Sequence, residues 1–513
     1  SHEKWVYDAL HGNLKAVAAS ESQLVTKHIV KGECQLFQLY LNNHSEAAAF
    51  FRPLMGFYQK SKLNKVAYLK DFLKYATVIE VGVVDPETFE LAVSDTVQDL
   101  KRVGFPECDY VTDENTIFQA LNMKSAVGAL YKGKKRDYFS TFTPEQMEQI
   151  VQDSCERLYS GKLGVWNGSI KAELRPKEKV LQNKTRTFTA APLDTLLAGK
   201  VCVDDFNNFF YSFNLEGPWS VGMSKFTRGW NTLLGKLPNG WLYCDADGSR
   251  FDSSLTPYLI NAVLQIRLTF MESWDIGEQM LKNLYAEIIY TPILAADGTI
   301  VKKFKGNNSG QPSTVVDNTL MVIITMHYAL RRAGISYENF SEHCAFVANG
   351  DDLIIAVAPG SEHILDTLQG SFHELGLNYD FSSRTHNKEE LCFMSHYGVL
   401  REGCLIPKLE QERIVSILEW DRATEPQHRL EAICAAMVEA WGYDELLYNI
   451  RLFYAWVLEQ APYNELARQG MAPYISENAL RRLYLDEEGD ISLYLQSLVQ
   501  NQWKDEQEEV VHQ

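Results

Sequence analysis

Apolar and polar residues follow two different periods along this chain of 513 residues. Short apolar runs between turn-forming residues are typical of β-strands, whereas apolar residues that recur every three or four positions are typical of helices with one buried face. The short runs predict strands at 241–244, 285–290, 344–348 and 353–357. Helical periodicity covers 68–75, 145–160, 256–284, 309–332 and much of 410–513, with 430–440 the clearest case. Residues 1–120 have the pattern of mixed helices and loops.

Composition is that of a soluble globular protein, with 46% hydrophobic and 23% charged residues. The length exceeds what one compact core usually holds, so two to four substructures are expected. We find no apolar run of about 18 residues, so the sequence predicts no transmembrane helix. The nine cysteines form no C-x-x-C pair, which argues against a zinc cluster or a disulfide framework and fits a reducing compartment. A start at Ser1 without an apolar leader is expected of a processed chain.

The most informative motif is Gly350-Asp351-Asp352, which follows Asn349 between two apolar runs. An Asn-Gly pair in such a setting is a strong signal for a β-hairpin. Two adjacent carboxylates at a hairpin tip supply the oxygen ligands that Mg²⁺ prefers, and this cation also bridges to phosphate. The tripeptide alone is expected by chance in about one chain in ten of this length. A metal site therefore requires partners elsewhere in the sequence.

A second group of carboxylates follows the predicted strand at 241–244, and it comprises Asp245, Asp247 and Asp252. Asp247 at the end of that strand is expected to face Asp351 across a sheet, where the two can hold two cations. Two metal ions about 3.5–4 Å apart activate an attacking hydroxyl and neutralise the leaving oxygen in a phosphoryl displacement. Asp252 is placed to accept a hydrogen bond from a substrate hydroxyl. The alternative is an acidic N-cap of the following helix, and Asp245 has no assigned role.

Hydroxyl and amide side chains gather where the helix of 309–332 begins. Thr314 and Asn318 are four residues apart and therefore share one helical face. Together with Ser309 they can bind a ribose 2′-hydroxyl, which is the group that distinguishes RNA from DNA. The alternative is a plain helix start in which Ser309 or Ser313 caps the first turn.

The net charge of −18 is unfavourable for binding nucleic acid, but screening limits each charge to about 8–10 Å at physiological salt. Cations concentrate at 124–136 and 171–186, whereas acids concentrate near the C-terminus. In 177–187 the charges alternate, as in a strand with one cationic face that can hold a triphosphate or guide nucleotides. The alternative is a solvated charged strand. Residues 132–136 also fit a nuclear localisation signal.

Together these motifs resemble the right-hand RNA-dependent RNA polymerases of positive-strand RNA viruses, in the order basic segment, D-x4-D, S-G-x3-T-x3-N and G-D-D. The text at 124–131 resembles the template-entry motif of that family, and 391–396 resembles its primer-grip hairpin. The texts at 244–257, 393–396 and 510–513 resemble the potyvirus nuclear inclusion protein b group. The terminus Val-Val-His-Gln is similar to a cut made by the viral protease in a polyprotein precursor.

The resemblance implies that Asp247 and Asp351 bind two Mg²⁺ ions, for which Mn²⁺ is a substitute, and that Asp352 supports them. It assigns the incoming ribose to Asp252, Ser309, Thr314 and Asn318. It assigns the triphosphate to Arg175, Lys179 and Arg186. It gives proton transfer to the leaving pyrophosphate to Lys388, with the cations of 171–186 as the alternative. It assigns template and primer RNA to Lys124, Ser125, Gly128, Lys171, Lys184, Phe393, Met394 and Ser395.

The implied architecture is a closed right hand of the α+β class, with an antiparallel palm sheet and a helical thumb. Its expected parts are an N-terminal region with fingers (1–199), a palm (200–255 and 306–397), a fingers insertion (256–305) and a thumb with an acidic tail (398–513). The implied partners are RNA, nucleoside triphosphates, a genome-linked protein primer, the viral protease or precursor, the replication complex and host translation factors. The implied locations are membrane-associated replication complexes in the host cytoplasm, and nuclear inclusions.

Three other functions use part of the same residue set. A catalytically silent RNA-binding scaffold would keep the shape without the chemistry, although every carboxylate expected of an enzyme is present. A two-metal nuclease would need neither the ribose face nor the basic segment. A reverse transcriptase is closer, but Gly350 before the two aspartates and Asn318 favour an RNA product.

Overall fold

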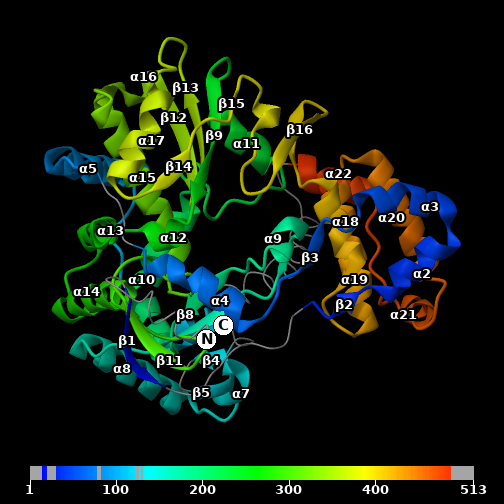
Figure 1. Ribbon diagram of the computed structural model, residues 1–513, viewed down its shortest axis with the longest axis horizontal. Helices are drawn as coiled ribbons and strands as arrows, with labels where there is room; N and C mark the ends of the chain where they lie inside the picture. Colours follow the sequence, from blue (N-terminus) through cyan, green and yellow to red (C-terminus); the bar gives the residue numbers. More distant parts are fainter. Residues whose placement is uncertain (1–13, 20–29, 78–81, 122–125, 129–130, 487–513) are drawn as a thin grey trace.

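The computed structural model describes the chain except for residues 1–13, 20–29, 78–81, 122–125, 129–130 and 487–513. Figure 1 shows three regions. A sheet flanked by helices lies at the top and is called the palm here. A second sheet with helices at the lower left is called the fingers, and the helical body on the right is called the thumb.

The palm sheet has β13 and β9 at its centre. The strand order is β12-β13-β9-β14, every pairing is antiparallel, and β15 also pairs with β9. The bounds are β9 (Leu242–Ser249), β12 (Cys344–Asn349), β13 (Asp352–Val357), β14 (Asn378–Asp380) and β15 (Arg384–Thr385). The strands predicted at 344–348 and 353–357 are confirmed, and the strand predicted at 241–244 extends further. The expected antiparallel palm is therefore present.

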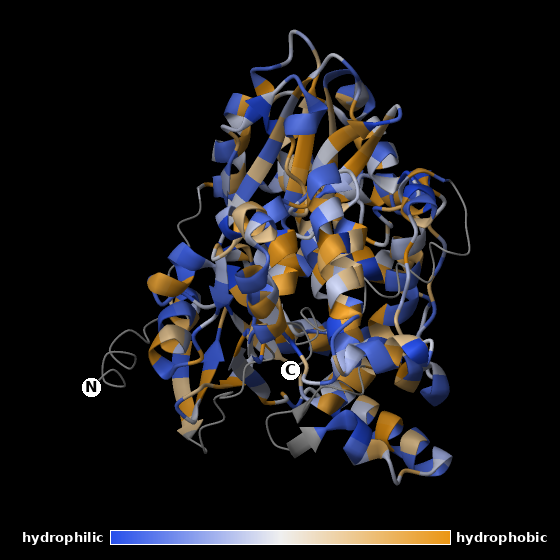
Figure 2. Ribbon diagram, turned by 90° about the vertical axis from the view of Figure 1, so that its right-hand side faces the viewer, coloured by the Kyte–Doolittle hydropathy of each residue, from blue (hydrophilic) through white to orange (hydrophobic). Residues whose placement is uncertain are grey.

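Both faces of the palm strand β13 are buried. Leu353 and Ile355 join the largest hydrophobic core, whereas Ile354 and Ala356 join a smaller core that includes Trp230. Successive side chains of a strand point to opposite faces, so this alternation requires a core on each side of the sheet. This explains why the strand is a continuous apolar run. Figure 2 shows the strands at the top of the molecule largely in the colour of hydrophobic residues.

Helix α15 (Thr314–Arg332) is the most buried helix next to the palm sheet. It packs against β12 and against α5 (Pro86–Arg102), α13 (Pro257–Phe270) and α17 (Ile364–Glu374). Every residue from 316 to 330 is buried. A helix surrounded in this way has no water to satisfy its polar side chains, so these must find protein partners. The buried polar residues of its first turns are therefore the ones to follow into the site.

The fingers contain a mixed sheet with the order β1-β11-β10-β6-β8, in which β10 and β6 are parallel. The bounds are β1 (Leu14–Ala19), β6 (Trp166–Ile170), β8 (Thr187–Ala190), β10 (Pro292–Leu294) and β11 (Thr299–Lys303). The packed helices α8 (Pro144–Ser160), α10 (Leu193–Ser212) and α14 (Asp275–Ile289) lie beside it (Figure 1).

The thumb combines helices from near both ends of the chain. Its hydrophobic core combines C-terminal helices with residues from α2 (Gln35–Asn43) and α3 (Ser45–Phe51). Its C-terminal members are α18 (Gln411–Glu419), α19 (Pro426–Ala440), α20 (Asp444–Val457) and α22 (Glu477–Leu485). The short strands at Gly32–Glu33 and Trp420–Asp421 also pair with each other. The helical character predicted for 410–513 is confirmed over the residues that the structure describes, and an N-terminal segment contributes to the same body.

Two predicted elements are wrong. The strand predicted at 285–290 is the end of α14, because a short apolar run also fits one face of a buried helix. The cationic strand predicted at 177–187 is replaced by β7 (Leu174–Pro176), the short helix α9 (Lys177–Leu181) and a turn. In α9 the buried residue is Val180. The alternating charges therefore belong to a short surface helix and not to a strand. In addition, the helical stretch predicted at 256–284 forms two helices, α13 and α14.

All nine cysteines are unpaired, as the sequence predicts. Within the described ranges no helix combines the length and the apolar character needed to cross a membrane.

Candidate active site

The β12–β13 hairpin carries the two adjacent aspartates. Asn349 pairs with Asp352, so the turn consists of Gly350 and Asp351, one position later than the Asn-Gly pair predicts. Gly350 has a φ of +59°, whereas Asp351 is not among the residues with positive φ. A positive φ at the first central residue alone is the pattern of a type II′ turn, which requires glycine there. The backbone therefore presents Asp351 at the tip and Asp352 at the start of the strand.

Two side chains from other elements hold this turn. The N–H of Gly350 donates to the hydroxyl of Thr319 on α15 at 2.8 Å. The hydroxyl of the buried Tyr379 on β14 donates to the carbonyl of Asp351 at 2.5 Å. The position of the turn is thus set by both the helix behind it and the neighbouring edge of the sheet.

Asp247 stands across the sheet from this hairpin. On β9, Ala246 pairs with Leu353, so the next residue on each strand, Asp247 and Asp352, lie side by side. The sequence predicts that Asp247 faces Asp351, whereas the strand register places it opposite Asp352, the residue after Asp351. Asp245, whose role the sequence leaves open, accepts a hydrogen bond from the N–H of Cys392 at 2.8 Å, so its carboxylate anchors the segment before the thumb.

The neighbouring carboxylates of Asp247, Asp351 and Asp352 repel one another. Burial raises the pKa of Asp351 to about 6, with the charges of Asp252 and Asp247 adding to the effect and that of Arg186 opposing it. Burial raises the pKa of Asp352 to about 7, together with the charges of Asp351 and Asp247. Asp351 is nevertheless accessible to water. A cation bound between these carboxylates would relieve their repulsion.

The donor set fits a divalent cation of the Mg²⁺ type. It consists of carboxylate oxygens, and Mg²⁺ is usually held by one or two carboxylates together with waters and substrate phosphates. In the described part of the chain no three carboxylate, imidazole or thiol groups converge tightly enough to enclose a metal ion by themselves. An open arrangement of this kind leaves coordination positions for phosphate.

The residues predicted to bind the ribose, here called the ribose face, are Asp252, Ser309, Thr314 and Asn318. Asn318 and Asp252 form a hydrogen-bonded pair, whereas the hydroxyls of Thr314 and Ser309 bond elsewhere. The amide nitrogen of Asn318 donates to Asp252 at 3.0 Å, and burial raises the pKa of Asp252. The hydroxyl of Thr314 instead donates to backbone carbonyls, including that of Ser309 at 2.9 Å. The hydroxyl of Ser309 accepts from the N–H of Thr189 at 3.3 Å. The structure thus brings Asn318 and Asp252 together, and turns Thr314 toward the loop before the helix.

The alternative in which a serine caps the helix is not what the structure shows. Ser313 is at the N-cap position of α15 but makes no side-chain cap hydrogen bond. Its hydroxyl accepts a hydrogen bond from the amide of Asn207 instead, at 3.0 Å. Asp252 lies within the short helix α12 (Phe251–Ser254) and is not its N-cap.

Three of the predicted cations gather around a buried acid, Glu173. Arg186 makes a two-pronged contact with its carboxylate, while Lys171 lies 3.3 Å and Arg175 3.8 Å from it. Although burial works against its charge, Arg186 and the other two cations hold the pKa of Glu173 below its usual range. The arginine side chain remains 54% exposed, so its guanidinium can pair with an incoming anion as well.

Arg186 also connects this basic cluster to the hairpin, since its charge lowers the pKa of Asp351. Two further lysines of the segment are predicted site residues. Lys179 is half-buried on α9, and Lys184 is exposed in the following turn. The basic cluster around Glu173 therefore consists of Lys171, Arg175 and Arg186.

Lys388 lies apart from the carboxylates. It begins the 3₁₀ helix η4 (Lys388–Glu390), and its ammonium donates to the side-chain oxygen of Asn239 at 2.8 Å. It also lies 5.7 Å from the ring centre of Tyr243, which precedes Asp247 by four residues on β9. At about 3.3 Å per residue, that is about 13 Å along the strand. A general acid must come within hydrogen-bond reach of the leaving group, and this conformation does not place Lys388 there.

The segment that resembles a primer grip forms a tight turn before the hairpin of β16 (Tyr397–Arg401) and β17 (Cys404–Lys408). Phe393 and His396 exchange backbone hydrogen bonds of 2.9 Å. Met394 and Ser395 between them have φ of +51° and +66°. Two consecutive non-glycine residues in this region are strained, and such strain is often found at functional sites.

The predicted RNA contacts therefore have different environments. Phe393 is buried, whereas Met394 and Ser395 are exposed. Gly128 lies in β4 (Ala126–Gly128), which pairs with β5 (Tyr131–Lys134). Lys124 and Ser125 lie outside the described residues.

Sequence reasoning missed several residues that hold the site. Thr319 follows Asn318 directly, and Tyr379 is an aromatic residue in a short strand. In the sequence, Glu173 is recognisable only as an acidic residue within the basic segment 171–186. A buried helix with consecutive polar residues is the signal that points to Thr319, but this burial becomes visible only in the fold.

Comparison with known proteins agrees with this geometry. The family model described as viral RNA-dependent RNA polymerase matches residues 40–458. The genome polyprotein of Turnip mosaic virus (strain Japanese) is 66% identical over 501 residues, which is 97% of this chain and 16% of the polyprotein. The genome polyprotein of Lettuce mosaic virus (strain 0 / isolate French) is 63% identical, over 100% of this chain and 16% of the polyprotein. The chain thus spans about one sixth of the length of these relatives.

A solved structure shares the fold. The Sicinivirus 3Dpol RNA dependent RNA polymerase superposes with a TM-score of 0.67 at 14% sequence identity, covering 95% of this chain and 100% of that chain. The right-hand α+β fold expected from the sequence is therefore confirmed. Since the family model covers most of the chain, the chain belongs to the viral RNA-dependent RNA polymerase family.

Proposed function

We propose that this chain joins nucleoside triphosphates into RNA on an RNA template, through a site that holds two Mg²⁺ ions, or Mn²⁺ in their place. One observation carries the proposal. Asp247, Asp351 and Asp352 meet at the ends of adjacent strands, where burial and the neighbouring carboxylates raise the pKa of Asp351 and Asp352, next to the Asn318–Asp252 pair. Such a site combines ligands for a cation with hydrogen-bonding groups for a sugar.

Each part of the site has a defined task in this proposal. The aspartates hold the cations, which supply charge neutralisation at the reacting phosphate. Arg186, with Lys171 and Arg175, orients the triphosphate, because guanidinium groups match phosphate oxygens. Asn318 and Asp252 bind the ribose hydroxyl. The strained turn at Met394 and Ser395 supports the primer end.

The direct test is RNA synthesis by the purified full chain on a homopolymer template with a primer and Mg²⁺ or Mn²⁺. Metal-dependent extension with release of pyrophosphate supports the proposal. Binding of RNA without extension under either metal ion would identify a scaffold instead.

Replacing Asn318 or Asp252 by alanine is expected to relax the preference for ribonucleotides over deoxyribonucleotides, because the linked pair loses a partner for the 2′-hydroxyl. The measurement is the ratio of kcat/KM for the two nucleotides in primer extension. Thr325→Val on the same helix is the control, since the Thr325 hydroxyl bonds only to the carbonyl of Met321 within α15. An unchanged ratio in both alanine variants would contradict the ribose assignment.

Millimolar Mg²⁺ or Mn²⁺ is expected to raise the thermal midpoint at about pH 8 much more than at about pH 5. The folded pKa values of about 6 for Asp351 and about 7 for Asp352 lie above the ordinary value of 3.8. The metal-free folded state therefore binds more protons than the unfolded state within that interval and loses stability as the pH rises through it. Cations bind the ionised carboxylates and offset this loss, whereas protons occupy the carboxylates at low pH. Equal shifts at both pH values would argue against a metal site here.

The partners and locations implied by family resemblance belong to the same proposal. They comprise a genome-linked protein primer, the viral replication complex, host translation factors, and sites in the host cytoplasm and nucleus. Of residues 132–136, Lys135 is buried, so a nuclear signal there would have to be read from the other basic residues.

A further inference from the structure

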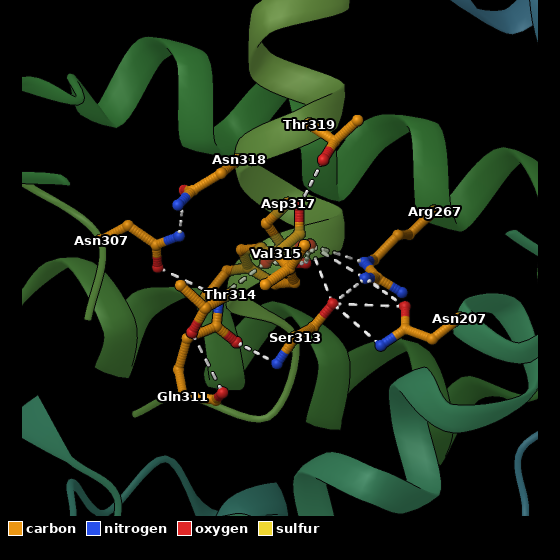
Figure 3. A network of polar contacts seen from close by, with 11 residues as sticks. Asn207, Arg267, Asn307, Gln311, Ser313, Thr314, Val315, Asp317, Asn318 and Thr319 are labelled. Atoms are coloured by element: carbon orange, nitrogen blue, oxygen red, sulfur yellow. Dashed lines mark hydrogen bonds and ion pairs between the residues drawn. The ribbon is translucent and has the colours of Figure 1, made fainter. Parts of the chain in front are cut away.

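A buried ion pair lies behind the ribose face, where α13 packs against α15. Arg267 is 0% exposed and Asp317 is 1% exposed, and the guanidinium donates to the carboxylate at 2.9 Å. The hydroxyl of Tyr285 donates to the same carboxylate at 2.8 Å, and Figure 3 shows the polar side chains around the pair. A buried ion pair often stabilises a fold no better than apolar side chains of equal volume. A role beyond stability is therefore worth seeking for it.

A chain of amide side chains runs from this pair to the ribose face. The amide nitrogen of Gln311 donates to Asp317 at 2.8 Å and to the side-chain oxygen of Asn307 at 3.1 Å. The amide nitrogen of Asn307 donates to the side-chain oxygen of Asn318 at 2.8 Å, and that of Asn318 donates to Asp252 at 3.0 Å. Figure 3 shows Gln311, Asn307 and Asn318 in this sequence beside the first turn of α15.

The carboxylate of Asp317 sets the direction of the whole chain. An ionised carboxylate only accepts hydrogen bonds, so Gln311 must turn its NH₂ group toward it. The oxygen of that amide then accepts from the N–H of Ser313 at 2.8 Å. Because Gln311 also donates to the oxygen of Asn307, the NH₂ group of Asn307 faces Asn318, and the NH₂ group of Asn318 faces Asp252. The orientation of the last amide is thus determined by a charge that no substrate touches.

The loop member of this chain is held firmly. The backbone N–H of Asn307 donates to the carbonyl of Asp252 at 2.8 Å. The preceding Gly306 has a φ of +85°, and a Cβ there would lie 2.9 Å from the same carbonyl. The buried ammonium of Lys303 donates to the carbonyls of Gly306 and Lys305 at 2.8 and 3.0 Å. Asn307 therefore has little freedom to turn its amide in the opposite sense.

Arg267 stabilises the charge that gives this direction. It donates to Asp317 and also to the side-chain oxygen of Asn207 at 2.8 Å, and its guanidinium lies 4.7 Å from the centre of the Phe206 ring. Its Nη1 has no hydrogen-bond acceptor among the described residues. The position of Arg267 thus satisfies the Asp317 carboxylate but leaves one of the arginine's own donors without an acceptor among the described residues.

We propose that Arg267 and Asp317 form a positioning unit that orients the Asn318 amide through Gln311 and Asn307, and thereby sets the preference for ribonucleotides. This inference rests on the proposed function and adds to it residues that touch neither substrate nor metal. Asp317 and Gln311 are positioning residues, whereas Asn318 is the group that meets the ribose.

The decisive variant is Gln311→Met in the full chain, because it breaks the relay and leaves the ion pair intact. The ratio of kcat/KM for a ribonucleotide to that for its deoxyribonucleotide is expected to fall about tenfold, the effect of one misplaced hydrogen bond. The loss is expected mainly in KM for the ribonucleotide, while kcat changes by no more than about threefold. Asp317→Asn is expected to have the same effect, since an amide at this position no longer fixes the direction of Gln311.

The matched control is Arg331→Met on the same helix. Arg331 forms an equally close pair with Asp95, with two contacts of 2.7 Å. It lies fourteen residues beyond Asp317, which is about 21 Å along the helix. This variant is expected to lower the thermal midpoint without changing the ribonucleotide preference. A merely structural role of the Arg267–Asp317 pair would make the two pairs behave alike.

A double variant separates the relay from an independent effect. We combine Gln311→Met with Asn318→Ala. The ratio of kcat/KM for a ribonucleotide to that for its deoxyribonucleotide is expected to be no lower in the double variant than in Asn318→Ala alone, because both changes act on the same hydrogen bond. Folding is checked by circular dichroism, and Gln311→Met decides the matter if Asp317→Asn does not fold.

A folded Gln311→Met protein with the wild-type ratio, alongside a lowered ratio in Asn318→Ala, overturns the inference. Additive losses in the double variant also overturn it. A wild-type chain that makes no RNA refutes the proposed function and this inference with it, and that outcome is visible in the wild-type reaction alone.

Discussion

Asp351→Asn is expected to lower nucleotide incorporation by about three orders of magnitude or more, the scale seen when a principal electrostatic group of an active site is lost. The structure places Asp351 at the tip of the palm hairpin, with Asp247 and Asp252 close enough to raise its pKa. In our proposal its carboxylate holds a cation against the reacting phosphate, and a neutral amide is a much weaker ligand. Primer extension with Mg²⁺ and with Mn²⁺ measures the effect.

The fold is expected to survive this change. The raised pKa of about 6 means that the ionised form of Asp351 is disfavoured by its surroundings, so asparagine removes a repulsive charge. The hydrogen bond from Tyr379 goes to the backbone carbonyl of residue 351 and is retained. Asp352→Asn is expected to cause a smaller loss of activity. Asp153→Asn on the exposed face of α8 is the control, and near-normal extension by Asp351→Asn would refute the metal assignment.

Glu287→Ala is expected to destabilise the fingers by about 3–5 kcal/mol, the scale of breaking a buried ion pair together with its hydrogen bonds. Glu287 is 1% exposed on α14. Its carboxylate accepts hydrogen bonds from Arg157, from the indole of Trp166 at 3.0 Å, from the hydroxyl of Thr195 at 2.6 Å and from the N–H of Gly164 at 2.8 Å. Removing it leaves several buried donors unsatisfied and leaves Arg157 with only one of its two acidic partners, Asp194 at 3.0 Å.

The same helix offers a control for that prediction. Glu278 on α14 pairs with Lys282 one turn away at 2.9 Å, and both side chains are nearly half exposed. An exposed pair of this kind contributes about 0.5 kcal/mol or less, so Glu278→Ala is expected to unfold at nearly the wild-type urea concentration. The prediction fails if the two variants have the same midpoint in chemical denaturation.

The palm is the part of the fold that local pattern predicts best. Its strands at 344–349 and 352–357 are apolar runs on either side of a glycine turn, and hairpin register follows from turn length. Even here the turn is displaced by one residue, because Gly350 takes the first central position rather than the second. The apolar run at 285–290 predicts a strand but belongs to helix α14. Glu287 within this run is buried because its partners, such as Trp166, come from segments far away in the sequence.

Part of the candidate site also follows from motifs. The spacing of Asp247 and Asp351 relative to their strands predicts that they meet across the sheet, whereas the register places Asp247 opposite Asp352, one residue beyond Asp351. The basic segment is less well predicted. Its alternating charges suggested a strand, whereas the cations converge on Glu173 because β7 and β8 bring Arg175 and Arg186 to the same acid.

Sequence alone determined the order of the motifs, the apolar strands of the palm, the carboxylates at their ends and, by resemblance, the right-hand fold. Tertiary structure alone decided that the N-terminal helices share the thumb core, that Lys388 lies away from the carboxylates, and that Gln311 and Asn307 connect Asp317 to Asn318 by hydrogen bonds. The physical reason is that periodicity reports which side of an element avoids water. The partners of buried polar groups, in contrast, depend on how distant segments pack.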